Sequence, residues 1–267
     1  MSKQDPPALR QFDDAECRHY RDQLREARYA ALADAEGFDQ ICFALEALGL
    51  RLLGQQGDLG KYEDRIGFYA RLSPVLTDLA KSKPSGFKTF EALYKTVRNA
   101  RNDNMHVGAY ARHATKAAIE LCIGLEEALM INVKRTIGIL MVKSPIIVEA
   151  WQPVAYARQL MLMHSFSFLP IWHDKDWWLL SELALVKFLN VSNTQRKTLL
   201  GLTINEACNK HSPNLDLVQI DENNIYTADT TIDELLERTN DARTLWLVSD
   251  DKRKDHLAGV LSPFELM

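Results

Sequence analysis

The sequence predicts an α+β protein of two domains, a helical bundle followed by a region in which short strands and helices alternate. Residues 1–135 carry apolar side chains at steps of three and four almost throughout, which is the period of amphipathic helices. From residue 136, short runs rich in Ile, Val, Leu and Trp alternate with short helical patterns. This second pattern occurs twice, with a period of about eighty residues, which indicates an internal repeat. We therefore place the domain boundary at residues 135 and 136.

Four or five helices are expected in the first domain, enough for an all-α bundle. The clearest covers residues 38–52, where apolar residues recur along one face and Gly54 follows as a helix-ending residue. A stretch rich in Lys, Ser, Pro and Gly, residues 81–86, is predicted to break the chain after the next helix. The remaining helices are expected at residues 14–33, 62–80, 89–99 and 106–126.

Each copy of the repeat is expected to follow the order strand, helix, strand, turn, strand. The first copy is assigned to residues 136–190 and the second to residues 191–267. In the first copy we expect strands at 146–148, 168–172 and 178–180 and a helix at 154–164. In the second we expect strands at 224–227, 245–248 and 257–261, a helix at 231–239 and a charged turn at 250–255. Each copy is small for an independent core, so the two should pack on each other.

The composition counts against a protein that coats nucleic acid, and the cysteine spacing against a metal site. Of the 267 residues, 46% are hydrophobic and 25% charged, with a formal charge of −4, so no basic field surrounds the whole chain. This counts against a protein that coats nucleic acid, but it leaves open an enzyme that engages a few phosphates. The four cysteines are widely spaced, with no His at zinc spacing, so no metal site is predicted.

The start of the chain and its apolar runs predict a cytoplasmic protein. Met1 is followed by polar residues, not by the apolar stretch of a signal peptide. The longest apolar run, residues 136–148, is interrupted by Lys143 and Pro145 and is too short to cross a bilayer. No membrane partner is therefore expected.

One short motif in the first domain combines residue types that suit phosphate chemistry. Residues 101–106 read Arg-Asn-Asp-Asn-Met-His and lie between two helical patterns. Arg101 is always charged and can hold two phosphate oxygens, and His106 can transfer protons near neutral pH. Asn102 lies four residues before His106, so on a helix it shares its face and can orient the ring or a phosphate. The alternative is structural, with His106 capping a helix and Arg101 in a surface ion pair.

An Arg-Asn-x-x-x-His motif before a long final helix resembles the HEPN superfamily, with coverage of roughly residues 10–135. The resemblance implies a metal-independent endoribonuclease with Arg101, Asn102 and His106 as catalytic residues and no catalytic cofactor. It also implies a homodimer, because in such nucleases two motifs meet across a two-fold interface, and an RNA substrate such as tRNA. Arg98, one turn earlier, is a further candidate for a phosphate contact. Toxin or defence roles occur in this superfamily, as do non-catalytic binding modules.

The second domain resembles a pair of CBS (cystathionine β-synthase-type) domains. The resemblance covers about half the chain and rests on four segments in the expected order. Residues 141–148 are similar to the opening segment of such a domain, and residues 168–171 to its strand that ends near a proline. Residues 227–236 resemble the step from strand to helix, and residues 259–266 the closing strand with its Ser/Thr-x-x-acid helix start.

CBS pairs bind adenosine-containing ligands between the repeats, so the resemblance implies a regulatory AMP, ADP or ATP here. It implies Ser262 near the phosphate and Glu265 on the ribose hydroxyls, with Glu in place of the usual Asp. Ile225 and Thr227 complete the predicted ligand-binding residues. In the first copy Ala184 occupies the position of the acid, so one functional cleft is expected in place of two. Two indoles, Trp177 and Trp178, could stack on a base, although packing is the commoner role of a Trp pair.

Two hypotheses of different classes follow. The first is a dimeric HEPN-like ribonuclease regulated by an adenosine nucleotide in the CBS pair. The second is a non-catalytic, nucleotide-sensing regulatory protein whose helical bundle dimerises or docks a partner. A structural scaffold without ligand or activity is a third, weaker alternative.

Overall fold

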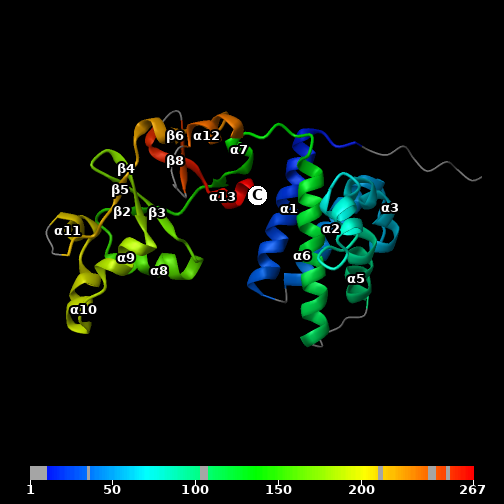
Figure 1. Ribbon diagram of the computed structural model, residues 1–267, viewed down its shortest axis with the longest axis horizontal. Coiled ribbons are helices and arrows are strands. Elements are labelled where there is room, and N and C mark those ends of the chain that lie inside the picture. The colour runs from blue at the N-terminus through cyan, green and yellow to red at the C-terminus, as the bar shows by residue number, and fades with distance from the viewer. Residues whose placement is uncertain (1–10, 35–36, 103–107, 210–212, 240–244, 251–252) are drawn as a thin grey trace, which may run out of the picture. The chain divides into compact units, whose positions relative to one another are not determined.

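The chain forms two compact units, residues 1–134 and residues 135–267. The computed structural model describes residues 11–34, 37–102, 108–209, 213–239, 245–250 and 253–267 (Figure 1). The secondary structure described in the first unit is helical, and the second unit combines helices with two sheets. The expected α+β class with an N-terminal helical region is thereby confirmed. Among the described helices, none is both long enough and apolar enough to span a membrane.

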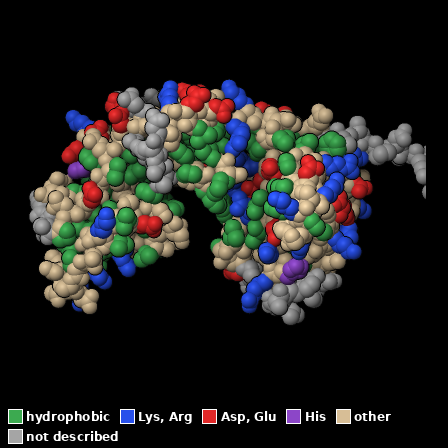
Figure 2. Space-filling view, in the orientation of Figure 1, with side chains coloured by type: hydrophobic (Ala, Val, Ile, Leu, Met, Phe, Trp, Pro, Cys, Tyr) green, Lys and Arg blue, Asp and Glu red, His purple; other side chains and the backbone are tan. Residues whose placement is uncertain are grey.

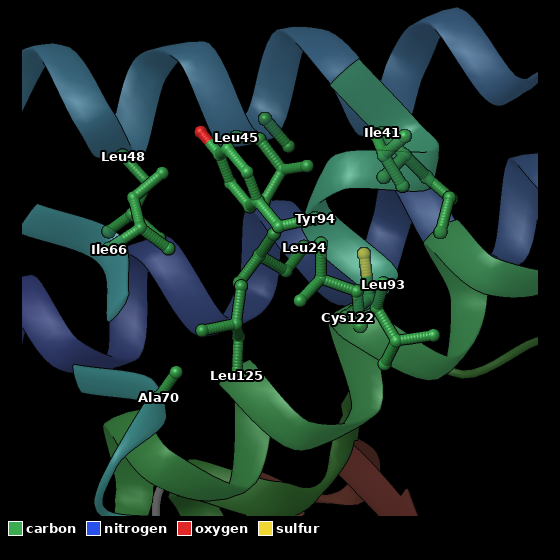
Figure 3. Close-up of a cluster of buried hydrophobic side chains, with 14 of the residues drawn as sticks. Leu24, Ile41, Leu45, Leu48, Ile66, Ala70, Leu93, Tyr94, Cys122 and Leu125 are labelled. Carbon is green, nitrogen blue, oxygen red and sulfur yellow. The ribbon is translucent and has the colours of Figure 1, made fainter. Parts of the chain in front are cut away.

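The part of the first unit that the structure describes contains five longer helices, and each buries one apolar stripe against the others. Side chains of Leu24, Leu45, Ile66, Tyr94 and Leu125 converge in the centre (Figure 3). The helices are α1 (Asp14–Ala33), α2 (Phe38–Leu53), α3 (Leu59–Ala70), α5 (Phe90–Asn102) and α6 (Gly108–Met130), with the short η2 (Val75–Leu79) and α4 (Ala80–Ser82) between α3 and α5.

The prediction of a single helix at 62–80 is wrong, because the helix α3 ends at Ala70. The helix α3 begins earlier, at Leu59, where the Asp58 side chain accepts a hydrogen bond from the Lys61 amide at 2.9 Å. Pro74 has no N–H to donate to the preceding turn, so a new segment, the π-helix η2, starts after it. Periodicity alone did not reveal this break.

The described residues of the second unit form two four-stranded sheets, in the orders β1-β8-β7-β6 and β2-β3-β4-β5. Its strands are β1 (Val142–Lys143), β2 (Val148–Glu149), β3 (Phe168–His173), β4 (Asp176–Ser181), β5 (Val218–Gln219), β6 (Ile225–Tyr226), β7 (Trp246–Asp250) and β8 (Arg253–Leu261). Its helices are α7 (Ile137–Leu140), α8 (Val154–His164), α9 (Glu182–Phe188), α10 (Asn193–Gly201), α11 (Ile204–Asn209), α12 (Ile232–Arg238) and α13 (Pro263–Leu266).

The two repeats exchange their first strands. The strand β1 precedes the first repeat's other strands but pairs with β8 of the second, and β5 precedes the second repeat's other strands but pairs with β4 of the first. Matching hydrogen bonds hold both exchanges. The Gly138 amide donates to the Ala228 carbonyl at 2.8 Å, and the Asn205 amide donates to the Ala150 carbonyl at 2.9 Å. Each repeat is thus completed by the other.

The two sheets share a buried apolar cluster that joins the repeats. It contains Trp177 and Leu179 from one sheet, Leu247 and Leu257 from the other, and Ile220 just after β5. Burial of this face explains why neither repeat needs a complete core of its own.

The remaining element predictions differ from the structure in detail. The expected charged turn at 250–255 is too long, because β8 already begins at Arg253 and continues the hairpin with β7. The expected strand at 146–148 lies slightly later, as β2. Helices α10 and α11 were not predicted, although Ser192 caps α10 by accepting from the Gln195 amide.

Candidate functional site

A cavity of about 220 Å³ opens beside the shared cluster of the two sheets. We call it the seam cavity. Its walls come from the β3–β4 hairpin, from the segment around β6 and from β7. The lining residues are Trp172, Lys175, Asp176, Trp177, Ile220, Glu222, Ile225 and Ser249.

Two indoles form the flat wall of the seam cavity. Trp172 and Trp177 are direct partners across the β3–β4 hairpin, so their side chains lie on the same face of the sheet. Their ring centroids are 5.1 Å apart, with an angle of 56° between the planes. Trp177 is only 1% exposed, whereas Trp172 is half-buried. Trp172 is therefore the ring that can present a face to a planar ligand.

The tip of the same hairpin places a cation at the cavity. Asp174 and Lys175 have φ values of 51° and 68°, the left-handed conformation that two-residue hairpin turns require and that Asn-Gly satisfies best. The exposed Lys175 ammonium has no hydrogen bond or ion pair among the described residues. Nearby, Asp176 accepts a hydrogen bond from the Gln219 amide group at 3.0 Å.

Ser262 and Glu265, predicted to bind a nucleotide, form a capping box at the start of α13. The Ser262 amide and hydroxyl both donate to Glu265 Oε2, at 2.7 and 2.6 Å. The Ser262 hydroxyl oxygen also accepts from the Phe264 amide at 3.3 Å. One oxygen of the Glu265 carboxylate is therefore already used by the helix start.

The other two predicted ligand residues lie elsewhere on the sheet. Ile225 lines the seam cavity, and the Thr227 hydroxyl lies 3.2 Å from that of Thr230. Tyr226 pairs with Val248 in the middle of β7, whereas Leu261 pairs with Trp246, the first residue of that strand. At about 3.3 Å per residue, this register separates Thr227 from Ser262 by roughly 13 Å along the strand direction.

The four predicted ligand residues are therefore not gathered in one place. Thr227, Ser262 and Glu265 are not among the described residues that line the seam cavity. In the first copy, Ser181 caps α9 by accepting from the Ala184 amide at 3.0 Å. Trp172 and Lys175, which line the seam cavity, were not among the ligand-binding residues predicted from the sequence. The signal available for them was a Trp on each side of a short charged turn.

In the helical unit, Arg101 and Asn102 are the last two residues of α5, and His106 lies outside the described residues. Arg101 Nη1 lies 3.0 Å from Asp39 Oδ1, and its Nε lies 3.4 Å from Glu46 Oε1. Its guanidinium also lies over the Phe43 ring, 4.9 Å from the centroid.

These three partners of Arg101 follow one another at steps of four and three on α2, so they share one helix face. They fix the direction of the guanidinium, and the two carboxylates compensate its charge. Arg98, one turn earlier, forms an ion pair with Glu63 of α3. Asn102 is exposed.

Side chains of both charge signs are interspersed on the visible surface (Figure 2). Among the residues that the structure describes, no group of three or more His, Cys, Asp or Glu side chains is arranged to hold a metal ion.

No family model and no curated protein matches the sequence. Solved structures with similarity over about half the chain include CBSX2 in complex with AMP, with 16% identity, 49% of this chain and 92% of that chain covered, and a TM-score of 0.35. Hypoxic Response Protein I with two coordinated zinc ions has 18% identity, covers 49% and 95%, and has a TM-score of 0.35. A hemolysin-like protein containing a CBS domain, from Oenococcus oeni PSU, has 15% identity, covers 50% and 88%, and has a TM-score of 0.35.

Proposed function

We propose that this protein is a regulatory protein that senses an adenosine nucleotide in its second unit. The observation that carries the proposal is the seam cavity, where a half-buried indole and two carboxylates lie beside Lys175, a cation with no partner among the described residues. These are the groups that a base, a phosphate and ribose hydroxyls require, respectively.

The size of the cavity suggests which parts of the nucleotide lie inside it and which remain outside. At about 220 Å³ it is smaller than the roughly 300–1,000 Å³ of sites that enclose a drug-sized ligand. The base would lie against Trp172 and Ile225, with the ribose facing Asp176 or Glu222. The phosphate would remain at the exposed edge, where Lys175 can pair with it.

The capping box at Ser262 and Glu265 is the competing location. Glu265 Oε2 is occupied by the two donors of Ser262, so only the other carboxylate oxygen could take a ribose hydroxyl. A nucleotide bound there would use the residues that the resemblance to CBS pairs implies. The two locations share no side chain, so substitutions can distinguish them.

Calorimetric titration of the full chain with AMP, ADP and ATP tests this proposal. We expect Trp172→Ala to weaken binding about 5- to 150-fold, because stacking on a base contributes about 1–3 kcal/mol. Lys175→Ala should weaken binding, and should do so less at high salt. Lys197→Ala, an exposed cation on α10 that does not line the cavity, serves as the matched control.

Loss of binding in Glu265→Gln with no change in Trp172→Ala would move the site to the capping box. Absence of binding for all three nucleotides would contradict the sensor function itself.

We further propose that the helical unit is the effector, a metal-independent endoribonuclease that acts as a homodimer. Arg101 and Asn102 end α5 immediately before the segment that carries His106, and α2 holds the Arg101 guanidinium in one orientation. In this reaction the RNA 2′-oxygen attacks the adjacent phosphorus and the 5′-oxygen leaves. One His accepts the 2′-hydroxyl proton and the other protonates the 5′-oxygen, leaving a cyclic phosphate. Each protomer supplies one His106.

Cleavage of a tRNA pool in EDTA tests the nuclease. Wild type should cleave, and His106→Ala should not, with the dimer intact in sedimentation. Glu46→Gln should strengthen RNA binding, because it removes one of the two carboxylates that compete with phosphate for Arg101. If wild type leaves RNA intact while nucleotide binding persists, the helical unit is the docking or dimerisation module of the alternative hypothesis.

A further inference from the structure

A second cavity, of about 760 Å³, lies on the helical side of the first repeat. We call it the helix groove. Its walls come from α8 and the turn after it, from α9 with the residues that follow it, and from α10. It shares no lining residue with the seam cavity. The lining residues are Arg158, Met161, Leu162, Ser165, Phe166, Glu182, Leu185, Val186, Leu189, Asn190, Arg196 and Leu200.

The groove follows from the spacing of side chains on its helices. Along α9 and its C-cap, the lining residues recur at steps of three, one and three, from Glu182 to Leu189, which is one helix face. On α8 the lining residues Arg158, Met161 and Leu162 likewise share a face. The helix α10, which follows α9 along the chain, contributes Arg196 and Leu200, one turn apart.

The floor of the groove is apolar and its rim is open. Met161, Leu185 and Leu189 are buried at the bottom. At the rim, Leu162 and Val186 are each 65% exposed, an unusual state for two large aliphatic side chains beside one cavity. The volume lies within the range of small-molecule sites.

Two cations stand over this apolar floor without full compensation. Arg158 is exposed and has no ion pair or hydrogen bond among the described residues. Arg196 donates from Nε to the Leu189 carbonyl at 3.0 Å, which orients its guanidinium over the end of α9. Glu182 is the only carboxylate that lines the described groove, and it forms no ion pair with either Arg.

We propose that the helix groove binds a small amphiphilic monoanion, a carboxylate with an apolar body. The carboxylate pairs with the guanidinium groups of Arg158 and Arg196, since Arg matches a carboxylate with two parallel hydrogen bonds. The apolar body covers Leu162 and Val186 and fills the floor. Charge sets the class of ligand: two cations against one anion favour an anion over a neutral or cationic amphiphile.

Titration of the full chain with decanoate, below its micelle concentration, tests this proposal, with decyltrimethylammonium as the cationic counterpart of similar length. We expect decanoate to bind at least about tenfold more tightly than the cation. The double variant Arg158→Ala/Arg196→Ala should lose at least about tenfold in decanoate affinity. Val186→Glu should abolish binding, since it places a carboxylate beside the apolar floor. Both changes are at exposed positions, and circular dichroism checks that the fold is kept.

The control is Lys197→Ala, which removes an exposed α10 cation that does not line the groove and should leave decanoate affinity unchanged. AMP affinity should be the same in all these variants. Equal affinity for the anion and the cation, or unchanged decanoate binding in the double variant, would overturn the proposal. The proposal would also be overturned if wild type binds no decanoate and Val186→Glu converts a dimer to a monomer. That result would show that the groove is an interface between two copies of the chain.

Discussion

The helical unit and the mixed unit differ in the ion pairing of their cationic side chains. In the helical unit Arg28, Arg98 and Arg101 are each held by carboxylates of a neighbouring helix. In the mixed unit Lys175 and Arg158 line cavities and have no partner among the described residues. Paired charges fix the helices relative to one another, whereas unpaired charges beside apolar walls are available to a ligand. The two proposed small-molecule sites, the seam cavity and the helix groove, both lie in the mixed unit.

Removing one partner of the most buried pair should have the largest effect on stability. Arg28 binds Glu126 through two hydrogen bonds, at 2.8 and 3.1 Å, and both side chains are buried. Arg25 Nε also lies 3.5 Å from this carboxylate. Glu126→Gln leaves these cations uncompensated and should cost about 3–5 kcal/mol, measured by urea unfolding followed by circular dichroism.

A half-exposed pair in the same unit provides the comparison. Glu63→Gln breaks the contact with Arg98, where both side chains are partly exposed, and should cost at most about 1 kcal/mol. Equal losses in the two variants would show that burial does not set the strength of these pairs.

Alkaline pH should destabilise the helical unit. Burial raises the pKa of Cys42 to about 12 from 9.0 and raises the pKa of the Cys122 thiol well above 9.0. Burial likewise raises the pKa of the Tyr94 hydroxyl. Because the folded state keeps these protons longer than the unfolded state, their contribution is complete below about pH 9 and is lost as pH rises toward 12.

The measurement is the melting temperature of wild type and Cys42→Ala between about pH 8 and pH 11. Wild type should lose stability over this range, and the variant should lose less, because one buried thiol no longer ionises on unfolding. An identical slope in the two proteins would exclude Cys42 as a source of the effect.

Replacing the hairpin-tip lysine should separate stability from binding. Lys175 has φ 68°, so Lys175→Gly relieves a strained backbone and should stabilise the protein by roughly 0.5–1 kcal/mol. The same change removes the cation and should weaken nucleotide binding. Lys175→Ala keeps the strain, so it should weaken binding without the gain in melting temperature. A loss of stability in Lys175→Gly would contradict the assignment of strain to this turn.

A small effect on stability is also expected at Arg101. Its side chain is partly exposed, and its two carboxylate partners are surface groups, so Arg101→Ala should change the free energy of unfolding by at most about 1 kcal/mol. Urea unfolding measures this change. A loss of several kcal/mol would assign Arg101 a mainly structural role and would weaken its place in the proposed nuclease.

The periodic spacing of apolar residues made much of the fold predictable from the sequence. The helices α1 and α2 and the order of elements in the repeat follow from apolar spacing, because each buries one stripe or one sheet face. The break at Pro74 was missed because apolar spacing continues on both sides of it. The exchange of β1 and β5 was missed because strands of two residues carry no period.

The candidate site was harder to predict because its parts are distant in sequence. The pair Ser262 and Glu265 is a local motif, and the same three-residue spacing is used by a capping box and by the ligand site that the resemblance implies. Trp172 and Ile225 line the same cavity only because the two sheets, which carry them at positions far apart in the sequence, pack against each other. Arg101 is a candidate from the sequence motif alone, but its partners on α2 depend on helix packing that no local pattern contains.

Hydrogen–deuterium exchange of the full chain with and without AMP tests the central claim, nucleotide binding at the seam cavity, most directly. We expect AMP to slow amide exchange in the β3–β4 hairpin, residues 168–181, and around Ile220 and Ile225. The capping segment at residues 259–267 should change little. Protection confined to residues 259–267, or none at saturating AMP, would contradict the assignment of the nucleotide to the seam cavity.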